Sequence, residues 1–245
     1  MNYLTFLIFG LLPSIVWLLF FLRKDVHPEP KGMVLKIFFL GTLVTLPAIF
    51  IERGAFEVVS ILNFPQIFYI FFGIALVEET LKFLVVKEKA ISSSEFDEPI
   101  DSMLYMIISA LGFAALENLL FFLSPEIMPL SFQEILVLAS FRFITATFLH
   151  ALCSGLIGYF LAKSFFEIEK QFKLILTGLG IATILHGLYN FSLMEIEGFL
   201  KFLIPIIILI SLAFFVSRGF KKLEKMKSIC LPSDALTKSK REGKI

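Results

Sequence analysis

The amino-acid sequence predicts an all-α membrane protein, a polytopic bundle of about seven transmembrane helices. Hydrophobic residues make up 58% of its 245 residues, 31 residues are phenylalanine, and the mean hydropathy is +0.88. Soluble domains contain about 45–50% apolar residues, and a water-soluble fold could not hide this much apolar surface. We expect one transmembrane domain over residues 1–220, followed by a basic cytoplasmic tail over residues 221–245.

Seven apolar stretches are long enough to cross a hydrocarbon core of about 30 Å. They lie at residues 3–22, 34–51, 66–87, 100–123, 134–162, 173–194 and 199–216. Backbone in lipid must satisfy its own hydrogen bonds, and the stretches lack the alternating pattern of barrel strands. Each stretch is therefore predicted to be a helix.

The distribution of basic residues between the stretches predicts the orientation in the membrane. Loops after the first, third and fifth stretches hold the basic residues Arg23, Lys24, Lys31, Lys87, Lys89, Lys163 and Lys170. The tail after the seventh stretch is also basic, whereas the other loops offer only Arg53, with Lys201 just inside the seventh stretch. Basic loops stay in the cytoplasm. The N-terminus is therefore expected outside and the C-terminus in the cytoplasm of a cell-membrane protein.

Ionisable and amide side chains interrupt the four middle stretches. They are Glu78, Glu79 and Lys82 in the third, Glu117 and Asn118 in the fourth, Arg142 and His150 in the fifth, and His186 and Asn190 in the sixth. A charge inside the bilayer is costly, so such residues usually face protein or a water-filled cavity and mark function. The first and last stretches carry no charge at mid-depth and are expected to be scaffold.

Helical spacing groups these side chains. Glu78 and Glu79 lie four and three residues before Lys82, which allows either acid to pair with the amine on one helix face. His186 and Asn190 are four residues apart and point into the same space. A rise of about 1.5 Å per residue puts Glu78, His150 and His186 at a shared depth of about 14–20 Å, with Glu117 nearer the outside. Small residues, Gly112, Gly155, Gly158, Gly178 and Gly180, are expected to let neighbouring helices approach closely.

This set of side chains suits the attack of water on an amide. A carboxylate in an apolar cavity can accept a proton from water and pass it to a leaving amine, and Glu78 is our candidate for that base. An imidazole can orient the water or bind the developing oxyanion, and so can a carboxamide. His150, His186 and Asn190 are the candidates for these parts.

The four motifs resemble those of the PrsW family of glutamate-type intramembrane proteases, a branch of the superfamily that includes the CAAX prenyl endopeptidases. The matching pieces are Glu-Glu-x-x-Lys at residues 78–82, Gly-Phe-Ala-x-x-Glu-Asn at residues 112–118, His150, and His-x-x-x-Asn at residues 186–190. They occur in the expected order and cover residues 66–194. Any one of them alone would be a weak signal.

The resemblance implies a peptidase in which Glu78 activates water and His150, His186 and Asn190 assist. It implies a membrane-anchored protein substrate, such as an anti-sigma factor, and the Glu-Asn pair in the fourth stretch favours this branch over prenyl endopeptidase activity. No nucleic-acid partner is expected, because the net charge is only +1. We expect no required metal, because two histidines and a carboxylate on separate helices lack the specificity of a His-Glu-x-x-His site. Metal dependence is left open.

Other interpretations of the same residues exist. Glu79, Lys82 and Arg142 could form a buried ion-pair network, and Glu117 with Asn118 could hydrogen-bond neighbouring helices. These five are therefore assigned supporting roles. A proton- or ion-coupled transporter would use the same acids and histidines as a relay, although we find no internal repeats of the kind transporters contain. A catalytically silent binding scaffold would have no use for burying the set.

Overall fold

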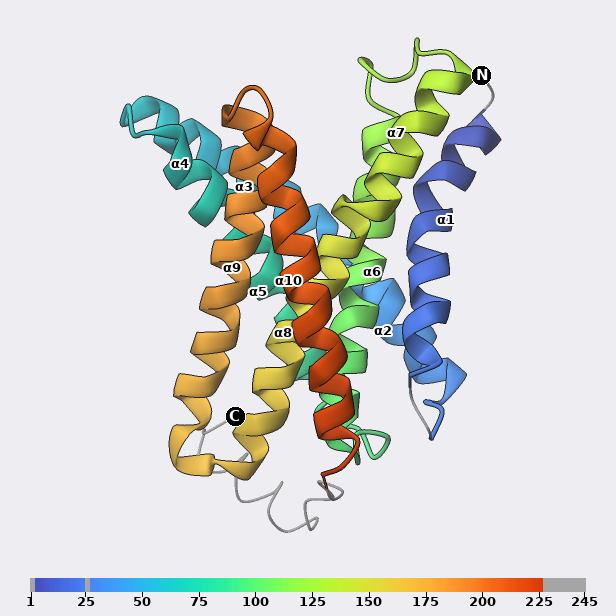
Figure 1. The fold of residues 1–245 in the computed structure, drawn as a ribbon, viewed down its shortest axis with the longest axis vertical. Helices are drawn as coiled ribbons and strands as arrows, with labels where there is room; N and C mark the ends of the chain where they lie inside the picture. The colour runs from blue at the N-terminus through green and yellow to red at the C-terminus, as the bar shows by residue number, and fades with distance from the viewer. Residues whose placement is uncertain (1–2, 25–26, 227–245) are drawn as a thin grey trace.

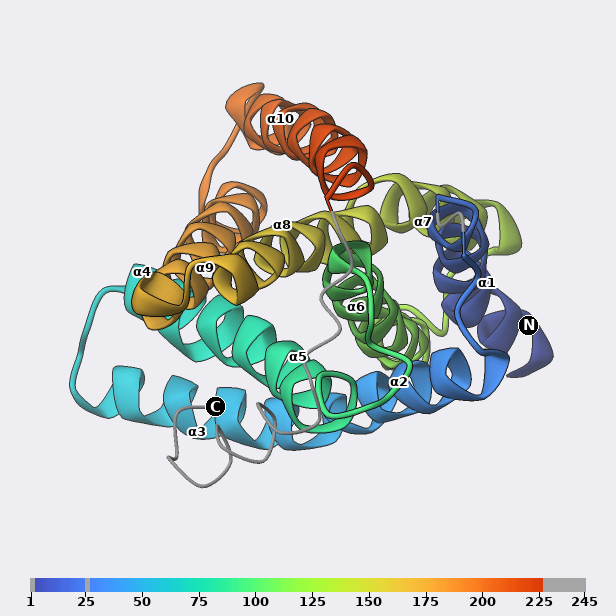
Figure 2. The ribbon, with the colours of Figure 1, turned by 90° about the horizontal axis from the view of Figure 1, so that it is seen from below.

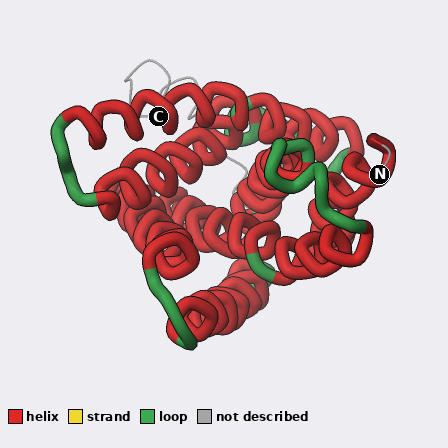
Figure 3. The backbone as a smooth tube through the Cα atoms, turned by 90° about the horizontal axis from the view of Figure 1, so that it is seen from above, coloured by secondary structure: helices red, strands yellow, loops and turns green. Residues whose placement is uncertain are grey.

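The computed structural model describes residues 3–24 and 27–226, and within them it consists of helices and loops without strands (Figure 3). The longer helices are α1 (Tyr3–Leu22), α2 (Lys31–Leu43), α3 (Thr45–Ile61), α5 (Leu76–Lys89), α6 (Pro99–Phe122), α7 (Phe132–Ile144), α8 (Ala146–Phe166), α9 (Gln171–Glu195) and α10 (Leu200–Leu223). Short segments are α4 (Gln66–Phe68), the π-helix η1 (Tyr69–Ala75) and the 3₁₀-helix η2 (Ile168–Lys170). The all-α prediction is confirmed.

Six helical segments are long and apolar enough to cross a membrane. They are Tyr3–Leu22, Lys31–Ile61, Pro99–Phe122, Phe132–Phe166, Ile168–Glu195 and Leu200–Leu223. The remaining predicted span, residues 66–87, is helical from Gln66 to Lys89 as α4, η1 and α5. It is more polar than the six because it contains Glu78, Glu79 and Lys82. The chain is thus a polytopic helix bundle.

Two predicted spans have different boundaries in the structure. The second does not end at residue 51 but continues as α3 to Ile61, so most of the predicted outer loop is helix. Two of its charged residues, Arg53 and Glu57, pair across one turn on the exposed helix face, with Nε and Oε1 3.5 Å apart. The fifth is not one helix: α7 and α8 meet at a break at Thr145.

Helices α6 and α8 form the centre of the bundle (Figures 1 and 2). Every residue from Pro99 to Ala115 is buried. Viewed from below, α9 and α10 lie on one side of α8, and α2 and α3 lie across the opposite side of the bundle. Helix α1 lies beside α6, and α7 packs against α8 and α1. The helices run alternately between the two ends, with α1 beginning at the end opposite the one where α10 finishes.

Glycines bring α2 and α6 into backbone contact. A Cβ atom on Gly41 would lie 2.1 Å from the carbonyl oxygen of Ser109, and one on Gly112 would lie 2.0 Å from that of Phe38. Thr42 Oγ1 also donates a hydrogen bond to the Gly112 carbonyl, at 3.0 Å. The predicted close approach holds at Gly112, Gly155, Gly158 and Gly178. It is wrong at Gly180, where no atom would lie within 4 Å of an added Cβ.

The π-helix η1 immediately precedes the acidic motif of α5. Its wide turn presses against α9, where a Cβ on Gly187 would lie 2.7 Å from the Phe71 ring. π-Helical turns are rare and occur often at functional sites. Here the turn sets the direction from which Glu78 and Glu79 approach α9. At the other end of the chain α10 continues to Leu223, and the predicted tail beyond residue 226 lies outside the described residues.

Candidate active site

The polar residues of the middle helices meet at a cavity of about 460 Å³ inside the bundle. Its walls come from α3, the η1–α5 segment, α6, α7, α8 and α9. Glu78, His150, His186 and Asn190, the four predicted catalytic residues, all line it. The structure therefore brings together acid, imidazole and amide groups that are far apart in the sequence.

Lys82 is fully buried and its ammonium links α5 to α8. Its Nζ lies 2.8 Å from Glu79 Oε1, 3.2 Å from Glu78 Oε2 and 2.8 Å from His150 Nδ1. It also lies 4.5 Å from the centre of the Phe113 ring. An ammonium only donates, so His150 Nδ1 accepts and Nε2 of that ring carries the proton. The buried charge is thus compensated on every side by acceptors.

A carboxylate holds each histidine by one ring nitrogen. His150 Nε2 lies 2.7 Å from Glu117 Oε2, and His186 Nδ1 lies 2.9 Å from Glu79 Oε1. The second nitrogen of His150 faces the ammonium, whereas His186 Nε2 faces Glu78 Oε2 at 3.9 Å. That separation is too long for a direct hydrogen bond and is suitable for one water in contact with both groups.

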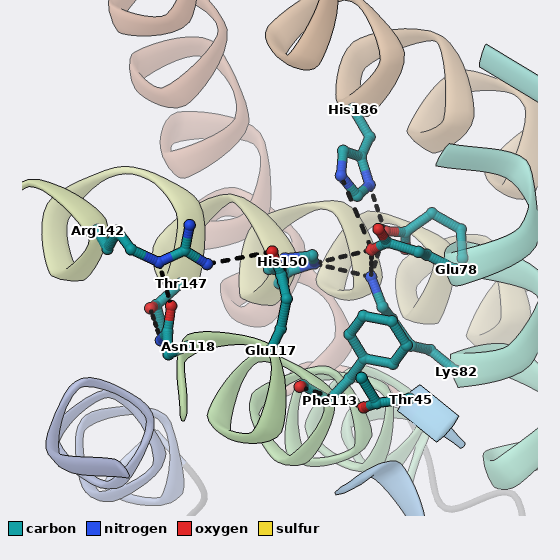
Figure 4. A network of polar contacts seen from close by, with 11 residues as sticks. Thr45, Glu78, Lys82, Phe113, Glu117, Asn118, Arg142, Thr147, His150 and His186 are labelled. Carbon is teal, nitrogen blue, oxygen red and sulfur yellow. Dashed lines mark hydrogen bonds and ion pairs between the residues drawn. The ribbon is translucent and has the colours of Figure 1, made fainter. Parts of the chain in front are cut away.

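The Glu-Asn pair of α6 ties α7 and α8 together (Figure 4). Arg142 Nη2 donates to Glu117 Oε1 at 3.1 Å, and Arg142 Nε donates to Asn118 Oδ1 at 2.5 Å. Asn118 Nδ2 in turn donates to Thr147 Oγ1 at 2.9 Å. Because Glu117 also contacts His150, its carboxylate connects this outer cluster to the acid and imidazole groups.

The five supporting residues therefore form one continuous network with the two histidines, as the ion-pair interpretation expects. Glu117 was expected nearer the outer surface than the histidines, yet its carboxylate reaches His150 directly. Long side chains on neighbouring helices can meet in this way although their Cα atoms lie at different heights along the helices. Asn190 lies one turn beyond His186 on the cavity wall and is half-buried.

Glu52 and Tyr189 also line the cavity, and neither was predicted as a site residue. Glu52 of α3 lines the cavity, but the predicted span ended one residue before it. If the predicted span had been extended, Glu52 would have been a charged residue inside the membrane, and such residues usually mark function. Tyr189 of α9 is 3% exposed, and its hydroxyl has no hydrogen-bond partner among the described residues. Its position three residues after His186 was the available signal, since that spacing shares a helix face.

Comparison with known proteins identifies the family. The family described as "PrsW family intramembrane metalloprotease" matches residues 29–217. The chain is 31% identical over 208 residues to "Protease PrsW" of Oceanobacillus iheyensis, which covers 84% of this chain and 91% of that protein. The chain belongs to the PrsW family. The chain is also 28% identical over 222 residues to Protease PrsW of Bacillus subtilis, which covers 90% of this chain and 94% of that protein.

This PrsW-family chain is therefore a multi-pass intramembrane protease that acts on a protein substrate. Protease PrsW of Geobacillus kaustophilus is a further relative, 31% identical over 189 residues, which cover 77% of this chain and 79% of that protein. No solved structure matches the chain. The matched residues 29–217 contain every polar residue of the cavity described above.

The PrsW family description names a metal, and three cavity residues offer suitable donors. One donor atom from each of Glu78, His150 and His186 lies within 4.8 Å of the other two. However, both ring nitrogens of His150 are already engaged, one by the Lys82 ammonium and the other by Glu117. The same ammonium also contacts Glu78 Oε2. The residues as arranged do not fit a metal ion unless Lys82 moves away.

Proposed function

We propose that this PrsW-family protease hydrolyses a peptide bond of a membrane-anchored protein, with Glu78 as the base that activates water. The observation that carries the proposal is the 3.9 Å gap between Glu78 Oε2 and His186 Nε2 on the cavity wall. Both atoms can accept a hydrogen bond, and a water between them would be polarised from two directions. The ammonium of Lys82 donates a hydrogen bond to Glu78 Oε2 at 3.2 Å and orients this carboxylate.

The reaction follows from these positions. The water oxygen attacks the carbonyl carbon of the substrate while its proton passes to Glu78. The carbonyl oxygen becomes an oxyanion, which Asn190 Nδ2 and the unpartnered Tyr189 hydroxyl can stabilise by donating hydrogen bonds. Glu78 then transfers the proton to the amide nitrogen, the C–N bond breaks, and the two peptide products leave. His150 connects Glu117 to Lys82 and holds the ammonium in place.

The substrate must present an extended backbone to these groups. Helical carbonyls are already hydrogen-bonded, so a membrane segment has to unwind before its peptide bond can react. The cavity supplies an apolar wall from residues such as Ile49, Phe141 and Leu193 to receive it. An anti-sigma factor with a single span is our proposed type of substrate, and a prenylated C-terminus is the alternative.

The proposed topology places the cavity in a cell membrane. We propose seven crossings, with Gln66–Lys89 as the seventh and its polar groups turned toward the cavity. The N-terminus lies outside, and the basic loops and the residues from 221 onward lie in the cytoplasm. The single domain of residues 1–220 would then hold the entire catalytic core of residues 66–194.

Purified protein in liposomes with a single-span anti-sigma-factor substrate tests the proposed mechanism. Glu78→Gln removes the base without changing the side-chain size, and we expect its cleavage rate to fall at least about 10²-fold. His186→Ala should show a loss of similar order. Glu57→Gln, a matched control on the exposed face of α3, should cleave at the wild-type rate. Wild-type rates for both site variants would refute these roles.

Chelation in the same assay tests the metal question. Because the Lys82 ammonium occupies the position that a metal would share, we expect a chelator to leave the cleavage rate unchanged. Elemental analysis of the purified protein should find much less than one divalent ion per chain. A stoichiometric ion whose removal abolishes cleavage would contradict the glutamate-only mechanism.

A further inference from the structure

Glu52 is an acid inside a candidate membrane-spanning segment, and none of the described residues pairs with it. It lies in the candidate span Lys31–Ile61, nine residues before its end, or about 14 Å along the helix. It lines the cavity and forms no hydrogen bond or ion pair with any residue that the structure describes. Intramembrane acids normally pair with a cation. Glu52 is an exception that the reaction scheme above does not use.

The other acids of the site are all compensated. Glu79 contacts Lys82 and His186, and Glu78 contacts Lys82. Glu117 contacts Arg142 and His150. Glu52, in contrast, shares the cavity wall with Glu78 and Glu117 but forms no ion pair with any described residue. The cavity therefore contains an acid whose positive partner is missing.

Among the described residues, the basic side chains nearest in space or sequence are already engaged. The Lys82 ammonium has three polar contacts and lies over the Phe113 ring. Arg142 is bound to α6 and lies over the Phe121 ring, with 4.4 Å between its guanidinium carbon and the ring centre. Arg53 is the next residue to Glu52, but its side chain is 81% exposed and pairs with Glu57. The partner is therefore not among residues 3–24 and 27–226, which the structure describes.

We propose that Glu52 receives a lysine or arginine side chain of the substrate, and that the protease selects membrane segments with a basic residue close to the cleaved bond. This rests on the proposed function, because the substrate must enter the same cavity. A basic residue in a membrane segment is itself unfavourable in lipid. Pairing with Glu52 would compensate both buried charges at once. The part of the substrate segment that carries the basic residue would therefore enter the cavity in preference to its neutral parts.

The test uses the full-length protein in detergent micelles and three fluorescent single-span peptides that differ at one central position, which is lysine, norleucine or glutamate. We expect the lysine peptide to bind the wild type about tenfold more tightly than the norleucine peptide, since a hydrogen bond to a charged group has roughly that effect. Glu52→Gln should remove this preference. Glu52→Lys should reverse it in favour of the glutamate peptide.

The matched control is Glu57→Gln, which changes the same residue type on the exposed side of α3 and should keep the lysine preference. If the wild type does not bind the lysine peptide more tightly than the other two, or if Glu52→Gln retains the preference, the proposal is overturned. Mass spectrometry of the same samples separates it from the proposed function. If the lysine peptide is preferred but no peptide is cleaved, the proposed proteolysis is refuted and the role of Glu52 stands. If cleavage depends on Glu78 but shows no charge preference, the role of Glu52 is refuted and the proposed proteolysis stands.

Discussion

Lys82 stabilises the site because its one positive charge serves two acids. The ammonium is completely buried, and Glu79 beside it is also completely buried. Ser154 Oγ donates a further hydrogen bond to Glu79 Oε2, at 3.2 Å. Removing one partner of such a pair leaves a charge that neither water nor protein compensates. The arrangement is therefore sensitive to loss of a single side chain.

We expect Lys82→Met to lower the free energy of unfolding by about 3–5 kcal/mol, because Glu79 would stay buried without its ammonium. Thermal denaturation in detergent, followed by circular dichroism, measures the change. Lys163→Met is the matched control, since its pair with Glu167 is part-exposed and worth only about 0–1 kcal/mol. Adding Glu79→Gln to Lys82→Met should recover part of the loss. Equal denaturation temperatures for Lys82→Met and the wild type would show that the ion pair adds no stability.

At the scale of the helix, contact between α2 and α6 positions the site. Thr45 Oγ1 donates to the Phe113 carbonyl at 3.3 Å, which fixes α3 against α6 near the ring that covers Lys82. The break between α2 and α3 at Val44 follows directly after the glycine contact. Backbone contact on one side of the break therefore decides where Glu52 lies on the other.

We expect Gly112→Ala to lower stability by about 1–3 kcal/mol, because the added Cβ would lie 2.0 Å from the Phe38 carbonyl oxygen and force the helices apart. The same displacement should reduce cleavage. Gly180→Ala on α9 is the control, because no atom would lie within 4 Å of the added Cβ. It should leave the cleavage rate unchanged and leave stability unchanged or raise it slightly. Denaturation temperature and cleavage rate are the measurements, and an unaffected Gly112→Ala variant would show that this contact can relax freely.

At the scale of the whole molecule, the loops at the two ends differ in charge. The loop between α6 and α7 and the loop between α9 and α10 contain no lysine or arginine, although Lys201 follows in the first turn of α10. The loops between α1 and α2 and between α8 and α9 contain basic residues, and Lys87 and Lys89 directly precede the loop between α5 and α6. Helices run alternately between these ends (Figure 1). This asymmetry supports the proposed orientation of the protein.

Cysteine labelling tests that orientation. After both native cysteines are replaced by serine, Ser131→Cys at the start of α7 should react with a membrane-impermeant maleimide in intact cells. Ser94→Cys, between α5 and α6, should react only after the membrane is opened, because we place it in the cytoplasm. The reverse pattern would invert the proposed topology.

Much of the site follows from where the sequence places charges. An acid or imidazole within an apolar stretch carries a cost that only a partner or a function offsets, and this argument selected Glu78, His150 and His186. Helical spacing likewise predicted that Lys82 could reach both acids, which the structure confirms. These inferences need only local geometry.

What could not be predicted depends on how helices are tilted and rotated against each other. The contact between Lys82 and His150 joins residues 68 positions apart, and no local pattern specifies it. Thr145 breaks the fifth span without a glycine or proline at that position to signal it. Glu52 was missed because the charges at residues 52, 53 and 57 resemble a loop, and only tertiary structure shows that one of them faces inward.

The wide turn of η1 gives its segment room for one residue more than an ordinary α-helix. Deleting one residue between Tyr69 and Ala75 would remove that extra residue and let the backbone wind as an ordinary α-helix, so that the helix after it would face nearly the same way. Deleting Val77, in the regular part of the same helix, would instead turn everything after it by about 100° and point Glu78 and Glu79 away from His186. A deletion should therefore be tolerated in η1 far better than in the first turn of α5.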